Sequence, residues 1–177
     1  MREIYLGDSY DIVKRFWADA LKSFAPLYSH SRFVPIGIRQ RYTTLTSIPI
    51  LDSDTLPSSD FSLLLDPDVG IPLPSEGCVR TSNSHAPLSF IAQLNGQLSP
   101  MCMICFDQSY HRRHELTREA QRENKRLVLK ERGIWSFYYV SHAPFLFMAG
   151  SPDNLVKVFQ QLVSVGIPRS RLEPQVG

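Results

Sequence analysis

Residues 101–106 read MCMICF, an unbroken apolar run that stops at Asp107. A short run of this kind is typical of a strand that is buried on both faces of a sheet. Helix-patterned sequence rich in charge follows over about residues 113–132 and closes at Gly133. A buried strand that leads into a helix favours an α/β protein with a mostly parallel or mixed sheet.

The same alternation extends along the chain on both sides of this run. Apolar residues recur at steps of three and four over residues 10–24, which predicts a helix capped by Asp8 or Ser9. Residues 88–98 suit either a helix or a strand, and a last helix begins after Ser151. Further strands are expected at residues 4–6, 41–51, 61–65, 134–140 and 144–149. We predict one three-layer α/β domain over residues 1–177, with about five to six strands.

Composition narrows the class of protein. Hydrophobic residues make up 43% and charged residues 20% of the 177, as in an ordinary globular domain. The net charge of +2 is too small to indicate nucleic acid by itself. No run of about 18 apolar residues predicts a membrane span, and the odd count of three cysteines favours a reducing, cytoplasmic location. Residues 71–87 are rich in proline and predict a long surface loop that is functional or mobile.

Acidic residues follow three of the expected strands. Asp8 comes after residues 4–6, Asp66 and Asp68 come after residues 61–65, and Asp107 ends the apolar run. Ligands of open α/β sheets bind beyond the carboxyl ends of the strands. Converging carboxylates there would bind Mg²⁺ or Mn²⁺ and activate water against a phosphodiester. We therefore predict a nuclease-like, metal-dependent hydrolase with these four aspartates as ligands, the alternative being that aspartate simply suits turns and caps.

The charged helix offers two interpretations. Lys and Arg outnumber Glu over residues 111–132, and basic residues recur every four residues from Arg118 to Lys130. Glutamates three residues before several arginines favour ordinary surface ion pairs. In the functional interpretation, Arg112, Arg113 and Lys125 bind the phosphates of a nucleic acid or another phosphorylated substrate. A non-enzymatic module that binds nucleic acid or protein through residues 113–132 is a further alternative.

Two other residue sets suggest chemistry. His142 lies between two expected strands, where it could act as a general acid or base beside Asp8 and Asp107. Gly7-Asp8-Ser9 resembles the first block of the SGNH or GDSL esterases, which implies Ser9 as an alternative nucleophile. That family places an acid three residues before its late histidine, whereas Tyr139 stands there in this chain. No organic cofactor is predicted.

Overall fold

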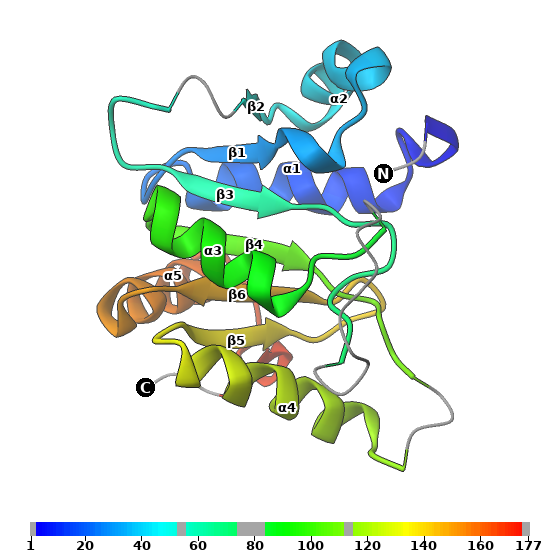
Figure 1. The fold of residues 1–177 in the computed structure, drawn as a ribbon. Helices are drawn as coiled ribbons and strands as arrows, with labels where there is room; N and C mark the ends of the chain where they lie inside the picture. The colour runs from blue at the N-terminus through cyan, green and yellow to red at the C-terminus, as the bar shows by residue number, and fades with distance from the viewer. Residues whose placement is uncertain (1–2, 53–55, 74–83, 112–114, 175–177) are drawn as a thin grey trace.

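The computed structural model describes residues 3–52, 56–73, 84–111 and 115–174. It contains one mixed sheet of seven strands in the order β2-β1-β3-β4-β6-β5-β7 (Figure 1). The strands are β1 (Leu27–His30), β2 (Ile50–Leu51), β3 (Ser62–Leu65), β4 (Cys102–Phe106), β5 (Trp135–Tyr139), β6 (Phe145–Ala149) and β7 (Leu172–Glu173). The helices are α1 (Ser9–Leu21), α2 (Arg39–Thr46), α3 (Leu88–Leu98), α4 (Arg118–Glu131) and α5 (Pro152–Ser164). The predicted α/β class is confirmed.

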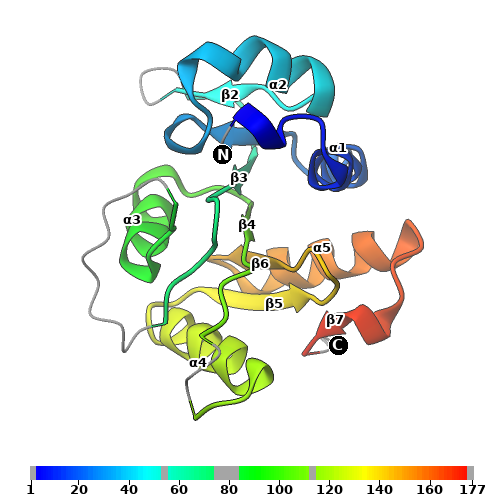
Figure 2. The same ribbon diagram turned by 90° about the vertical axis from the view of Figure 1, so that its right-hand side faces the viewer.

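Two apolar layers sandwich the sheet. One lies under α1 and α5 and includes Trp17 and Phe159, and the other lies under α3 and α4 and includes Ile91 and Leu129. Figure 2 shows these helix pairs on opposite sides of the sheet. The central strand β4 supplies alternate side chains to the two layers, so every one of its residues is buried. This arrangement explains the apolar run at residues 101–106.

The order of the strands creates a switch point between β1 and β3. From β1 the chain crosses to β2 on one side, whereas β3 and β4 follow on the other side, and all four strands are parallel. The hairpin β5–β6 then adds an antiparallel strand, because β6 pairs antiparallel with both β4 and β5. In open α/β sheets a switch point of this kind is where ligands bind.

The prediction from the sequence is partly wrong for the region before β3. Residues 4–6 are not a strand, because Glu3–Tyr5 form a 3₁₀ helix in which Ile4 is 78% exposed. Residues 41–51 split into α2 and the short edge strand β2, and the buried Tyr42 donates or accepts a bond with the Ser29 hydroxyl at 2.6 Å. The strand β1 was not expected. The sheet ends in two very short edge strands, β2, which lies within the strand expected at residues 41–51, and β7, which was not expected.

For the other elements, the predicted bounds differ less from those in the structure. The charged helix begins at Arg118 rather than near residue 113, because the Thr117 hydroxyl caps it by accepting the Ala120 N–H. Most of the predicted loop at 71–87 lies outside the described residues, although Gly70 and His85 form a bridge between its two ends. Among the described residues, none of the helices has the length and apolarity that crossing a bilayer requires.

His30, at the end of β1, gives the fold a pH dependence. Burial first, and the Arg32 charge second, lower the pKa of His30 from 6.5 to about 4. Its Nδ1 accepts the Arg32 N–H at 3.1 Å, which requires that atom to be unprotonated. The unfolded chain therefore binds more protons between pH 4 and 6.5, so stability falls as the pH is lowered through this window.

We expect His30→Asn to flatten this pH dependence, because an asparagine oxygen accepts the same N–H without titrating. The wild type should lose about 1–2 kcal/mol more between pH 7 and pH 4 than the variant, a value reduced for the solvent that reaches this half-buried ring. Urea unfolding at both pH values measures the difference. His142→Asn, at an exposed histidine, is the control, and an equal effect of the two variants would contradict the assignment.

Candidate functional site

A pocket of about 230 Å³ opens at the carboxyl ends of β3 and β4, beside the switch point. Figure 2 looks onto this edge of the sheet, with the N-terminal 3₁₀ helix and the start of α1 beside it. The walls come from the 3₁₀ helix, the first turns of α1, the segment after β3 and the end of β4. The lining residues are Tyr5, Asp8, Tyr10, Lys14, Asp66, Pro67, Asp68, Phe106 and Gln108.

Lys14 anchors α1 to the end of β3 at the base of this pocket. Its ammonium group donates to Asp11 at 2.9 Å and to Asp66 at 2.7 Å, and all three side chains are buried. Burial alone would lower the pKa of Lys14, but the charges of Asp66 and Asp11 outweigh it and raise that pKa well above its usual range. Asp66 is therefore neutralised by a resident cation.

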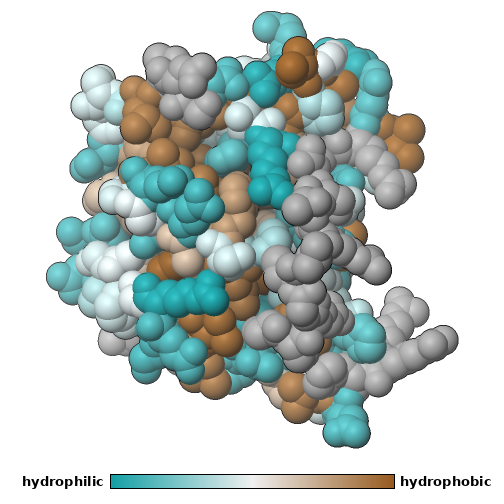
Figure 3. Space-filling view, in the orientation of Figure 1, coloured by the Kyte–Doolittle hydropathy of each residue, from teal (hydrophilic) through white to brown (hydrophobic). Residues whose placement is uncertain are grey.

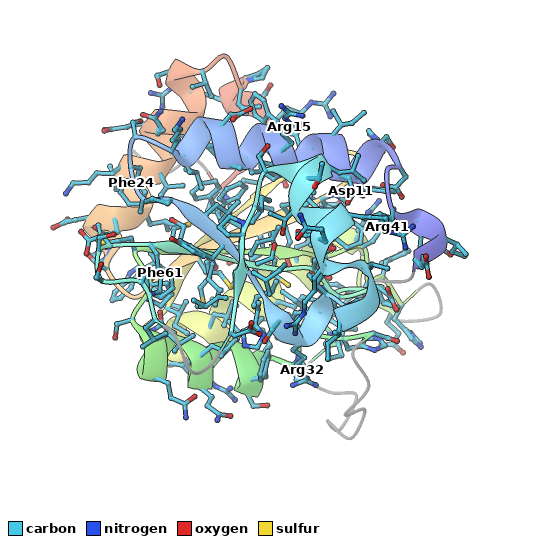
Figure 4. The ribbon with its side chains drawn as sticks, turned by 90° about the horizontal axis from the view of Figure 1, so that it is seen from above. Asp11, Arg15, Phe24, Arg32, Arg41 and Phe61 are labelled. Atoms are coloured by element: carbon cyan, nitrogen blue, oxygen red, sulfur yellow. The ribbon has the colours of Figure 1, made fainter. Side chains whose placement is uncertain are left out.

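The start of α1 is fixed by its own aspartates. Asp8 caps the helix, because its Oδ1 accepts the N–H groups of Tyr10 at 2.8 Å and of Asp11 at 3.3 Å. Asp11 in turn accepts the Gly7 N–H at 2.7 Å. Arg41 of α2 forms an ion pair with Glu3 of the 3₁₀ helix (Figure 4). Helix α2 thereby holds the 3₁₀ helix, which forms one wall of the pocket. The predicted cap at Asp8 is confirmed.

Asp107 belongs to a different cluster, on the opposite face of the sheet. Its carboxylate accepts from Lys125 at 2.8 Å, from the Tyr138 hydroxyl at 2.7 Å and from the Ile71 N–H at 2.9 Å. The Ser109 hydroxyl lies 2.6 Å from Asp107 and 2.7 Å from Lys125. Burial and then the Asp107 charge raise the pKa of Tyr138 well above its usual range. The Asp107 carboxylate is therefore held by groups of the protein on both of its oxygens.

The strand-end aspartates are thus divided between two places. Asp8, Asp66 and Asp68 line one pocket, as the sequence suggested, but Asp107 turns toward Lys125 of α4. In the part of the chain that the structure describes, no group of three or more His, Cys, Asp or Glu side chains could hold a metal ion. The metal hypothesis remains a prediction, and no ready-made cage of ligands supports it.

The residues proposed for phosphate binding are paired or lie elsewhere. Lys125 is 1% exposed, and Arg112 and Arg113 lie outside the described residues. Elsewhere on α4, Arg122 pairs with Glu173 at 3.0 Å, and Arg126 pairs with Glu123. Figure 3 shows hydrophilic and hydrophobic side chains mixed over the face that α3 and α4 cover. These contacts favour the interpretation of an ion-paired surface helix.

The described residues give no support to Ser9 and His142 as a nucleophile and its base. Ser9 is the exposed first residue of α1, and the strand that would precede a nucleophile of the SGNH type is replaced by the 3₁₀ helix. His142 is also exposed, and its ring centre lies 6.2 Å from that of Tyr10. Within the described ranges, no hydrogen bond joins Ser9 to His142.

Sequence reasoning missed Gln108 as a residue of the site. Its Nε2 donates to the Tyr10 hydroxyl at 3.0 Å and to the His142 carbonyl at 3.2 Å, which joins three separate segments at the rim. Its position immediately after a strand-end aspartate was a usable signal, but a neutral amide carries no charge that would single it out in the sequence. His142 thus contributes a backbone carbonyl that fixes the Gln108 side chain.

Comparison of the chain with known protein families, with curated proteins and with solved structures finds no significant match.

Proposed function

We propose that the protein binds a small nucleoside-like ligand in the pocket at the ends of β3 and β4. The observation that carries the proposal is the position of three carboxylates, Asp8, Asp66 and Asp68, around a pocket beside the switch point. Dinucleotide-binding α/β folds use an acidic residue in this region to accept hydrogen bonds from ribose hydroxyls. Carboxylates accept but do not donate, so they suit a ligand with several hydroxyl or amino groups.

The charge of the pocket narrows the ligand further. Three aspartates and one lysine line it, which gives a formal charge of −2. Lys14 is already engaged by Asp11 and Asp66, so its charge is compensated within the protein. A phosphate placed here without a metal would be repelled. The pocket therefore favours an uncharged or cationic nucleoside over a nucleotide.

The apolar surface of the pocket suits a flat ring. Tyr5, Tyr10 and Phe106 are aromatic, and the rings of Tyr10 and Phe106 pack edge to face at 5.4 Å. Aromatic side chains bind ligand rings by stacking or edge contacts. The volume of about 230 Å³ lies below the roughly 300–1,000 Å³ of typical ligand pockets, which fits one base and one sugar.

Thermal unfolding in the presence of nucleosides tests the proposal. We expect adenosine to raise the melting temperature, 5′-amino-5′-deoxyadenosine to raise it more because its ammonium group is cationic, and adenosine monophosphate to raise it least. Binding at a concentration of 100 times Kd adds about 2.7 kcal/mol to the stability. Asp68→Asn should weaken the effect, whereas Asp60→Asn, at an exposed aspartate outside the pocket, should leave it unchanged. A melting curve that no nucleoside moves at millimolar concentration would contradict the proposal.

Metal-dependent phosphodiester hydrolysis is the second candidate, favoured by the same charge of −2. Mg²⁺ commonly uses one or two protein carboxylates and completes its shell with water and substrate phosphates. Asp8 and Asp68 are the residues best placed for that role, since Asp66 is paired with Lys14. The same melting experiment separates the two functions. This candidate requires Mg²⁺ or Mn²⁺ to raise the melting temperature and adenosine monophosphate to bind only with the metal.

A further inference from the structure

Gln108 stands at the rim of the pocket with its side-chain amide held in one orientation. Its Nε2 donates to two atoms, the Tyr10 hydroxyl oxygen at 3.0 Å and the His142 carbonyl oxygen at 3.2 Å. A carbonyl oxygen can only accept a hydrogen bond. Rotating the amide by half a turn would place two acceptors against each other, so the orientation follows from the chemistry of the partners.

This orientation decides what Gln108 and Tyr10 present to a ligand. The amide oxygen Oε1 of Gln108 has no protein partner within the described residues, and Gln108 lines the pocket. The Tyr10 hydroxyl accepts from Gln108 through its oxygen, which leaves its proton to donate. The two side chains therefore offer one acceptor and one donor next to each other on the same wall.

We infer that Gln108 and Tyr10 form a reader for the base edge of an aminopurine, an inference that rests on the proposed nucleoside site. Adenine presents an amino donor at N6 beside an acceptor at N1, which complements Oε1 of Gln108 and the O–H of Tyr10. Hypoxanthine presents the reverse pattern, an acceptor at O6 beside a donor at N1–H. Its O6 would face Oε1 of Gln108, acceptor against acceptor, whereas the Tyr10 hydroxyl can turn to accept from N1–H through its second lone pair. The mismatch therefore lies at Gln108. The protein should select adenosine over inosine.

Calorimetric titration of the full chain with adenosine and with inosine tests this selection. The wild type should bind adenosine about tenfold more tightly, because a mismatched polar pair loses a hydrogen bond and sets two acceptors against each other. Gln108→Leu should remove most of the difference, mainly by weakening adenosine. Gln97→Leu, at an exposed glutamine on α3, is the matched control and should keep the full preference.

The outcomes are separable. Equal affinity of the wild type for the two nucleosides, or an undiminished preference in Gln108→Leu, would overturn the reader while leaving the nucleoside site intact. Failure of both nucleosides to bind would overturn the site and the reader together. Tyr10→Phe gives a second test should Gln108→Leu not fold, because it removes the donor to N1 and leaves the ring in place. It should weaken the binding of adenosine, and an adenosine affinity equal to that of the wild type would also overturn the reader.

Discussion

Replacing Lys125 by methionine is expected to lower the free energy of unfolding by about 3–5 kcal/mol. Lys125 is 1% exposed and donates to both oxygens of Asp107, at 3.1 and 2.8 Å. Methionine preserves most of the packing volume but leaves the Asp107 carboxylate buried without its cation. Chemical unfolding followed by fluorescence of the two tryptophans measures the loss.

Lys130→Met is the matched control, since it makes the same substitution on the same helix at an exposed position. Surface changes of this kind alter stability by about 0.5 kcal/mol or less. Adding Asp107→Asn to Lys125→Met should recover part of the loss, because the pair of changes removes the stranded charge. A Lys125→Met variant as stable as Lys130→Met would show that the buried pair contributes nothing to the fold.

Gly70→Ala is expected to be the second severe substitution, with a loss of about 3 kcal/mol or more. The backbone at Gly70 has φ = +129°, and an added Cβ would lie 2.4 Å from Oδ1 and 2.8 Å from Cα of Asp107. Backbone strain at such a position costs on the order of 1–3 kcal/mol, and the contact with Asp107 adds to it because the network of Lys125 holds that carboxylate in place.

Gly166→Ala separates the two contributions. Gly166 also has a positive φ, +98°, but an added Cβ meets nothing within 4 Å. This control should lose only the backbone part, and thermal unfolding of both variants gives the comparison. If Gly70→Ala and Gly166→Ala were equally stable, the close approach of Gly70 to Asp107 would have no energetic importance.

The centre of the fold could be predicted from the sequence because its signals are local. The apolar run of β4, the hairpin of β5 and β6, and the amphipathic pattern of α1 each lie in one short window. The regions that were misread depend on distant partners. Residues 4–6 look like a strand but have no neighbouring strand to pair with, and Tyr42 reads as a strand residue although its hydroxyl bonds Ser29 from a helix.

Only part of the candidate site could be predicted from the sequence, for a related reason. Asp66 and Asp68 line the pocket because they follow β3 at the edge where the parallel strands end, whereas Asp8 lines it as the N-cap of α1 and not from the end of a strand. Spacing along the chain does not reveal which lysine forms an ion pair with each buried aspartate. Lys14 and Lys125 lie on helices that cover opposite faces, and they draw Asp66 and Asp107 in different directions.

The buried ion pairs Asp107–Lys125 and Lys14–Asp66 also differ in how far apart their partners lie along the chain, and we expect this difference to favour one order of folding. Asp107 and Lys125 are 18 residues apart, whereas Lys14 and Asp66 are 52 residues apart. Closing the longer loop costs more conformational entropy, so β4 and α4 should associate before α1 docks on the sheet. The pocket is lined by residues of α1 and by residues at the ends of β3 and β4. A bound ligand would therefore act as a clasp that holds α1 on the sheet.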